Sequence, residues 1–239
     1  MHRLKAVLFD HDGTLVDSEA VHLQLWQDIL AQEGYALSLA QFKTHCVGIP
    51  TPATAQNLAG LFGLSDASGS PIALEIAAGL AKRKSLATTN WLKHNAFPLM
   101  PYVREAISMF AGAGYQLAVV TGAGRDGIAS TLQAHGLASA FCVVVTGADV
   151  RRSKPQPDCY LRAVELLGLS VDDCISFEDT DNGVRASRAA GVRCIGVRNT
   201  FTNAHRFEGV EALFDTLQEA SHWLMAKYLN PPAQESAHA

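Results

Sequence analysis

The sequence lacks the features that mark membrane, secreted and disulfide-rich proteins. The apolar run before Asp10 is too short for a signal-peptide core or a membrane span. The five cysteines are dispersed and form no Cys-x-x-Cys pair, so we expect buried, free thiols in a reducing compartment. We therefore expect a soluble, cytoplasmic protein that does not act at a membrane.

The sequence also has little charge, and no excess of basic residues. Its 19 basic and 23 acidic residues give a net charge of −4, which is not typical of a nucleic-acid-binding protein. Apolar residues make up 48% of the chain and charged residues only 18%, which excludes general disorder and suffices for a sizeable core. We expect a small molecule as partner and no nucleic acid. The composition leaves the oligomeric state open and is compatible with a monomer.

Short apolar runs alternate with helical patterns from about residue 97 onward. Such alternation is typical of a doubly wound, Rossmann-like parallel sheet with helices on both faces. The expected strands span residues 4–9, 116–121, 141–145, 173–177 and 192–197, and the expected helices span residues 104–113, 127–135, 158–167, 183–190 and 211–228. Pro231-Pro232 are expected to stop the last helix, and the tail up to Ala239 is expected to be disordered.

Only helical patterns occur between the first strand and residue 97. Leu23, Trp26 and Leu30 recur at helical spacing, for example. Further helices are expected over residues 39–46, 51–62 and 72–94. We therefore predict an α/β core domain made of residues 1–17 and 97–239, with an all-helical domain of residues 18–96 inserted after the first strand.

The segment Asp10-His11-Asp12-Gly13-Thr14, directly after the first strand, has the most specific chemistry. Side chains two apart in an extended chain point the same way, so both carboxylates face one site. One ionised carboxylate can attack phosphorus and form an aspartyl phosphate, while the second protonates the leaving oxygen and then activates water. Gly13 permits a tight turn close to a phosphate. The alternative is an acidic turn without a catalytic role.

Two later segments have residues suited to an anionic ligand. Thr121 and Gly122 follow the second expected strand, where free N–H groups at the start of a helix can bind a phosphate. Lys154 stands before Pro155 and Pro157, which restrain its loop. A fixed ammonium there can neutralise the first carboxylate and the phosphoryl oxygens. The alternative for Lys154 is an ordinary surface lysine.

A third segment offers ligands for a metal ion. Glu178 and Asp179 follow the fourth expected strand. Mg²⁺ prefers hard oxygen ligands, usually one or two carboxylates with water and phosphate oxygens. Asp10, Asp179 and the backbone carbonyl of Asp12 can supply such ligands, with Glu178 bound directly or through water. Asp181 is expected to cap the helix that follows.

These four segments occur in the order of the four motifs of the haloacid dehalogenase superfamily, which they resemble. The first, Asp-His-Asp-Gly-Thr-Leu-Val-Asp-Ser-Glu from Asp10 to Glu19, is most similar to phosphatases and phosphomutases with an α-helical cap, such as phosphoglycolate phosphatase and β-phosphoglucomutase. The resemblance implies Mg²⁺-dependent phosphoryl transfer, with Asp10 as nucleophile, Asp12 as acid and base, and the inserted helices as a cap. The residues it implies for holding the phosphoryl group are Thr121 and the amides of Gly122 and Ala123.

The cap is expected to select the substrate. His22 and Trp26 lie four apart on one helix face, as in the β-phosphoglucomutase branch, and Lys84 is a candidate for binding an anionic group. A core tryptophan and a solvated lysine are the alternatives. Arg125 is expected either to contact the substrate or to be solvated. Thr51 stands where the mutase has an arginine for the non-transferred phosphate, which favours a hydrolase.

We therefore expect a Mg²⁺-dependent phosphatase that hydrolyses a small phosphomonoester, either a sugar phosphate or a phosphoglycolate-like molecule, through an aspartyl phosphate. A β-phosphoglucomutase-like phosphomutase is the first alternative, and a catalytically silent phosphometabolite-binding protein is the second. Phosphonate cleavage would need a Schiff base on Lys43 or Lys84. Dehalogenation is disfavoured because it has no use for Asp12 as an acid or for the metal carboxylates.

Overall fold

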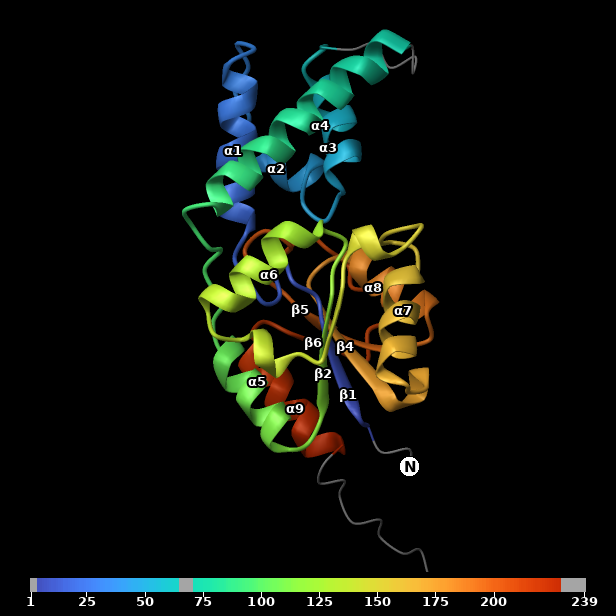
Figure 1. Ribbon diagram of the computed structural model, residues 1–239. Helices are drawn as coiled ribbons and strands as arrows, with labels where there is room; N and C mark the ends of the chain where they lie inside the picture. Colours follow the sequence, from blue (N-terminus) through green and yellow to red (C-terminus); the bar gives the residue numbers. More distant parts are fainter. Residues whose placement is uncertain (1–3, 65–70, 229–239) are drawn as a thin grey trace, which may run out of the picture.

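A parallel sheet forms the centre of the computed structural model, which describes residues 4–64 and 71–228 (Figure 1). In this part of the chain the sheet has six strands, in the order β3-β2-β1-β4-β5-β6. They are β1 (Ala6–Phe9), β2 (Gln116–Val120), β3 (Val143–Val145), β4 (Cys174–Glu178), β5 (Arg193–Val197) and β6 (Ala212–Phe214). The strand order reverses beside β1, and such a reversal opens a crevice at the carboxyl ends of the strands.

Helices cover both faces of the sheet, as parallel strands require. One face is covered by α5 (Val103–Gly112), α6 (Arg125–Ala134) and α9 (Leu217–Tyr228), and the other by α7 (Asp158–Leu167) and α8 (Asp181–Ala189) (Figure 1). Val7 and Phe9 of β1 pack with the first layer, while Ala6 and Leu8 pack with the second. Phe9 stacks on Phe177 with 5.3 Å between ring centroids, so β1 and β4 are joined through the core.

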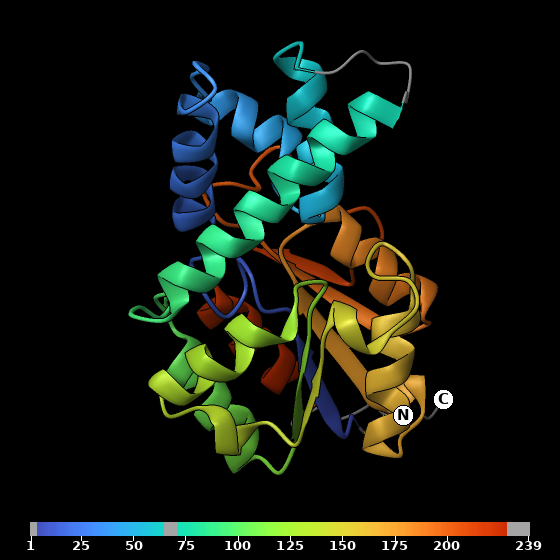
Figure 2. The same cartoon turned by 45° about the horizontal axis from the view of Figure 1, so that its top comes forward.

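Four helices form a separate layer beyond the carboxyl edge of the sheet (Figures 1 and 2). They are α1 (Glu19–Ala31), α2 (Leu39–His45), α3 (Thr51–Leu61) and α4 (Pro71–Leu92). They share an apolar cluster of their own, which includes Trp26, Leu30, Phe42 and Leu58. The long α4 packs on α1 and α3 and reaches α6 of the sheet layer (Figure 2).

Two chain segments that lie side by side connect this layer to the sheet. The N–H of Asp17 donates to the carbonyl oxygen of Pro98 at 2.8 Å, and the N–H of Met100 donates to that of Leu15 at 3.0 Å. We propose this pair of crossings as the domain boundary, with residues 18–96 as the helical domain and residues 1–17 and 97–239 as the α/β domain.

The expected elements are confirmed except near the carboxyl end of the chain. The helix expected over residues 211–228 begins only at Leu217, and Ala212–Phe214 form the edge strand β6 beside β5. An apolar run of three residues does not distinguish a strand from a helical turn. The pairing with β5 therefore determines that this segment is a strand. The apolar pattern also did not predict three short 3-10 helices, which are η1 (Ala138–Ala140), η2 (Gly147–Asp149) and η3 (Val171–Asp173).

The expectation that all five thiols are buried is wrong for Cys142. All five cysteines are free, and four of them are buried, but Cys142 is exposed where the chain enters the edge strand β3. The expected disorder of the tail up to Ala239 lies outside the described residues. Among the helices that the structure describes, none combines the length and the apolar character that a bilayer crossing needs.

We predict that Leu58→Ala lowers the free energy of unfolding by about 2–5 kcal/mol, because it leaves a cavity in the cluster of the four inserted helices. Leu61 on the same helix is 38% exposed, so Leu61→Ala is the matched control and should cost less than about 1 kcal/mol. Denaturant unfolding measures both values. Equal losses for the two variants would contradict a separate core in this layer.

Candidate active site

The carboxyl ends of β1, β2 and β4 bring the expected polar residues to one edge of the sheet. Asp10 follows β1, Thr121 follows β2, and Glu178 ends β4. Because β1 lies between β2 and β4, these residues are neighbours across the sheet. The N–H of Asp10 donates to the carbonyl oxygen of Phe177 at 3.0 Å, so the ladder continues up to the site. The register of the sheet therefore sets the geometry of the site.

The ammonium group of Lys154 lies at the centre of this edge. Its Nζ donates to Asp10 Oδ1 (2.8 Å), Glu178 Oε1 (2.6 Å) and the carbonyl oxygen of Val120 (2.8 Å), which uses all three of its donors. The hydroxyl of Tyr160 donates to the same oxygen of Glu178. Burial alone would lower the pKa of Lys154, but the charges of Asp10 and Glu178 raise it above its usual range. The side chain is therefore a fixed cation.

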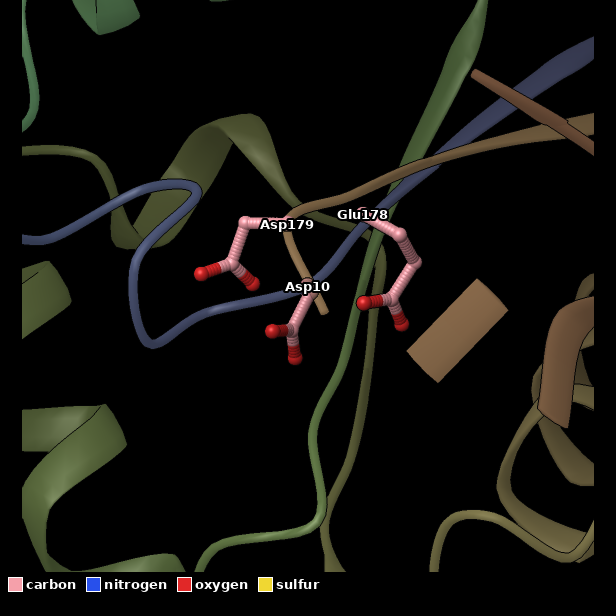
Figure 3. A group of neighbouring side chains, drawn as sticks. All are labelled: Asp10, Glu178 and Asp179. Atoms are coloured by element: carbon pink, nitrogen blue, oxygen red, sulfur yellow. The ribbon is translucent and has the colours of Figure 1, made fainter. Parts of the chain in front are cut away.

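Three buried carboxylates, those of Asp10, Glu178 and Asp179, lie close together (Figure 3). Each offers one oxygen, and these oxygens lie within 4.8 Å of one another. Glu178 Oε2 and Asp179 Oδ1 are buried and have no hydrogen-bond partner within the described ranges. Burial raises the pKa of Glu178 to about 7, and burial together with the charge of Asp10 raises that of Asp179 well above its usual range. Crowded hard oxygens with two unpartnered atoms fit a divalent cation.

Two glycines allow the main chain to approach these carboxylates. A Cβ atom on Gly183, in the first turn of α8, would lie 1.8 Å from Glu178 Oε2, and one on Gly13 would lie 2.0 Å from Asp179 Oδ2. Gly13 also has a φ of +80°, which side chains disfavour. Both positions therefore require glycine as long as the two carboxylates keep their places.

The cap of α8 differs from the expectation. Thr180 is the N-cap, and its hydroxyl accepts from the N–H of Gly183 at 3.1 Å. Asp181 is the first helical residue, and its carboxylate instead accepts from the N–H groups of Arg206 and Phe207. Both residue types favour N-cap positions, and the sequence alone did not decide between adjacent candidates. Asp181 thus holds a loop of the core.

Asp12 lies among groups that stabilise its ionised form. Ser18 Oγ donates to Asp12 Oδ1 at 2.7 Å, His11 Nδ1 lies 3.4 Å from Oδ2, and His22 Nε2 lies 4.0 Å from Oδ1. Burial would raise the pKa of Asp12, but His11, His22 and Ser18 hold it below its usual range. A nearby phosphoryl anion would raise the pKa again. A role of Asp12 as an acid therefore depends on bound substrate.

A cavity of about 370 Å³ opens over this edge of the sheet. On the side of the sheet it is lined by Thr121, Gly122, Ala123 and Ser153, next to Asp10. The N–H of Ala123 donates to the hydroxyl of Thr121 at 3.0 Å, so this expected phosphate donor has an internal partner in the structure. The expected phosphate-binding residues thus lie together on one wall of the cavity.

The helical layer supplies the opposite wall, which includes His22, Trp26 and Lys84. The ammonium of Lys84 donates to His22 Nδ1 at 3.1 Å and to Thr88 Oγ1 at 3.0 Å. Burial lowers the pKa of Lys84 to about 8. Burial and the charge of Lys84 lower that of His22 to about 4, so His22 is neutral and accepts this hydrogen bond. Trp26 belongs to the apolar cluster as well as to the wall.

Glu19 is a lining residue that the sequence analysis did not single out. It is 8% exposed, and burial together with the charge of Asp12 raises its pKa to about 8. A protonated carboxyl at neutral pH can both donate to and accept from a hydroxyl group. Glu19 is the last residue of the first motif and the first residue of α1, and this position was the available signal in the sequence.

Two candidate residues lie away from the cavity lining. The guanidinium of Arg125 forms an ion pair with Asp149, and its side chain is 60% exposed. The Nζ of Lys43 donates to the carbonyl oxygen of Thr200 at 2.5 Å and lies 5.7 Å from the ring centroid of Phe201. Of the two lysines considered for a Schiff base, the described lining therefore contains only Lys84.

Two side chains that hold the carboxylates were missed. They are Tyr160, whose hydroxyl donates to Glu178, and Asn199, whose Nδ2 donates to Asp179 Oδ2 at 2.8 Å. Tyr160 lies inside α7, where its spacing indicates only a core residue. Asn199 follows β5 at the same edge of the sheet, and a polar residue at a strand end was a usable signal.

Comparisons with known proteins show the family and the fold of the chain. The family model for haloacid dehalogenase-like hydrolases matches residues 7–197. Fructose-1-phosphate phosphatase YqaB of Escherichia coli is 34% identical over 197 residues, which cover 82% of this chain and 97% of that protein. The structure of CbbY from Rhodobacter sphaeroides in complex with phosphate is similar, with a TM-score of 0.73, 25% identity, and coverage of 89% and 94% of the two chains. β-Phosphoglucomutase of Clostridium difficile has the same fold, with a TM-score of 0.77, 18% identity, and coverage of 95% and 97%.

We predict that Gly183→Ala destabilises the protein by about 1–3 kcal/mol, because the new methyl group overlaps the buried carboxylate of Glu178. Gly79, in the middle of α4, has no atom within 4 Å of an added Cβ. Gly79→Ala is the control and should raise the free energy of unfolding by up to about 1 kcal/mol. Denaturant unfolding compares the two. A neutral effect of Gly183→Ala would contradict the close approach of α8 to Glu178.

Proposed function

The chain belongs to the haloacid dehalogenase-like hydrolase family, as a phosphoric monoester hydrolase, and we propose that it hydrolyses a small phosphorylated sugar through a phosphoaspartate at Asp10. The observation that carries the proposal is the contact of Lys154 with Asp10 and Glu178, beside the three-carboxylate cluster and at the floor of the cavity. The related fructose-1-phosphate phosphatase supports a sugar phosphate as the substrate class. We also propose a cytoplasmic location.

In the first step, a carboxylate oxygen of Asp10 attacks phosphorus as the bond from phosphorus to the leaving oxygen breaks. Asp12 gives its proton to that oxygen. In the second step Asp12 takes a proton from water, whose oxygen attacks phosphorus as the bond to Asp10 breaks. The products are inorganic phosphate and the free alcohol, and both carboxyl groups return to their first state.

The charge of the phosphoryl group must be neutralised while it moves. The ammonium of Lys154 is already fixed beside Asp10 and needs no reorganisation. Thr121 and the amides of Gly122 and Ala123 would orient the phosphoryl oxygens on the same wall of the cavity. For Ala123 this means exchanging its internal partner, the Thr121 hydroxyl, for the substrate.

The acidic cluster fits Mg²⁺, which would be held by Asp10, Asp179 and the backbone carbonyl of Asp12. Glu178 would take part through Oε2, directly or through water, because its Oε1 already accepts from Lys154 and Tyr160. The bound ion would add positive charge for the phosphoryl oxygens and would offset the mutual repulsion of the carboxylates.

The wall made by the helices would bind the sugar. Neutral His22 has its Nε2 4.0 Å from Asp12 Oδ1 and would therefore lie near the leaving oxygen that Asp12 protonates. Lys84 and Glu19 offer hydrogen bonds to hydroxyl groups, and the ring of Trp26 offers an apolar surface. Arg125 is a weaker candidate because its partner is Asp149.

A phosphomutase is the main rival. A phosphomutase must hold a second phosphate in the cap. Among the described cap residues that line the cavity, Thr51 stands between two prolines, and Lys84 is the single cationic side chain. This favours the hydrolase. A phosphometabolite-binding protein without turnover is the second rival, and it has no use for the fixed pair of Lys154 and Asp10.

We predict phosphate release from sugar monophosphates that depends on Mg²⁺, stops with chelator, and falls by more than about a thousandfold in Asp10→Asn, because the amide is not a nucleophile. Asp28→Asn is the control, since Asp28 is an exposed residue of α1 that accepts from Gln24. A colorimetric assay with a panel of sugar monophosphates measures the phosphate released by the wild type, by Asp10→Asn and by Asp28→Asn, with Mg²⁺ and with chelator.

Full activity of Asp10→Asn would contradict the nucleophile. Hexose phosphate interconversion that needs a bisphosphate and releases little phosphate would show a mutase. Binding of sugar phosphates without either reaction, equal in the wild type and Asp10→Asn, would indicate the binding protein.

A further inference from the structure

Asn199, which follows β5, connects three segments through its side-chain amide. Its Nδ2 donates to Asp179 Oδ2 at 2.8 Å and to the carbonyl oxygen of Gly13 at 3.1 Å. Its Oδ1 accepts from the N–H groups of Phe201 (2.8 Å) and Thr202 (3.1 Å). Two acceptors on the nitrogen side and two donors on the oxygen side fix the orientation of the amide. The side chain of Asn199 therefore has one orientation, which is set by the N–H groups of the loop that follows it.

The contact with Asp179 decides which oxygen of that carboxylate faces the acidic cluster. Asn199 occupies Oδ2, while Oδ1 is buried without a partner among the residues described. The Asp179 side chain is fully buried in the intact structure, so its Oδ2 is bonded by Asn199 and not by solvent. Since Asn199 also holds Gly13, the turn after Asp12 and the carboxylate of Asp179 keep a fixed relation.

The loop that carries Asn199 is held by the helical layer. Phe201 packs against the apolar cluster of α1–α4, and its ring meets that of Phe42 edge to face at 6.1 Å. Lys43 donates to the carbonyl oxygen of Thr200 and lies over the ring of Phe201. Helix α2 therefore contacts this loop through two neighbouring side chains, those of Phe42 and Lys43. One of the contacted residues, Phe201, lies only two positions after Asn199.

We propose that Asn199 is a positioning residue that orients Asp179 for the metal ion, and that the seating of Phe201 against α2 keeps Asn199 in place. Metal affinity then depends on a contact with the helical layer as well as on the ligands themselves. Partners that orient metal ligands commonly contribute about 10–100-fold in affinity. This inference rests on the metal site of the proposed function.

The test is the affinity for Mg²⁺ alone, measured by calorimetric titration of the full-length protein without substrate. Asn199→Ala should weaken binding by about 10–100-fold. Asn57→Ala is the matched control, because Asn57 donates to the carbonyl oxygen of His45 within the helical layer and is remote from the carboxylates. Its affinity should equal that of the wild type. Asn199→Ala with an affinity within twofold of the wild type would overturn the proposal, even if its melting temperature falls.

Phe201 provides a second, independent variant. Phe201→Ala should weaken Mg²⁺ binding by about 3–10-fold through the loop, less than loss of the amide itself, whereas Phe201→Leu, which keeps an apolar anchor, should stay near the wild type. Melting temperatures in chelator show whether each variant folds. Unchanged affinity in Phe201→Ala would overturn the dependence on the helical layer. A wild-type protein that binds no Mg²⁺ would instead contradict the metal site of the proposed function, and this inference with it.

Discussion

The contact on which the site depends is the buried ammonium of Lys154 between Asp10 and Glu178. Asp179 adds a third buried carboxylate to the same group, which then holds three acidic side chains and one cation. Coulomb repulsion among buried carboxylates is strong, and a single ammonium does not balance it. The cluster therefore favours protons on Glu178 and Asp179, or a divalent cation between the carboxylates.

The sheet supplies the rigid frame for this arrangement of charge. Asp10 and Glu178 project from adjacent parallel strands whose register pairs Phe9 with Phe177, and the rings of these two residues stack. Gly183 then brings α8 directly against Glu178. Such close packing leaves the carboxylates few other positions, which is the pre-organisation that phosphoryl transfer uses. The helical layer completes the site with residues suited to hydroxyl groups.

Much of the site follows from the sequence because strand ends of a parallel sheet meet at one edge. Asp10 and Thr121 were predicted on this basis, whereas Lys154 was predicted from the two prolines that restrain its loop. The structure brings all three to the cavity. Buried hydrogen-bond partners have no such signal: Tyr160 has the spacing of a core residue, yet its hydroxyl contacts Glu178. The short strand β6 was missed because pairing with β5, not local preference, decides its conformation.

The most direct test of the account is to find the phosphoryl group on the protein during turnover. A reaction with a sugar monophosphate and Mg²⁺, quenched in acid within milliseconds, would be digested and its peptides mapped by mass spectrometry. Transfer through Asp10 predicts one phosphoryl group on the peptide that contains Asp10, and none when chelator is present. A phosphoryl group on another residue, or turnover at full rate with no labelled peptide, would contradict it.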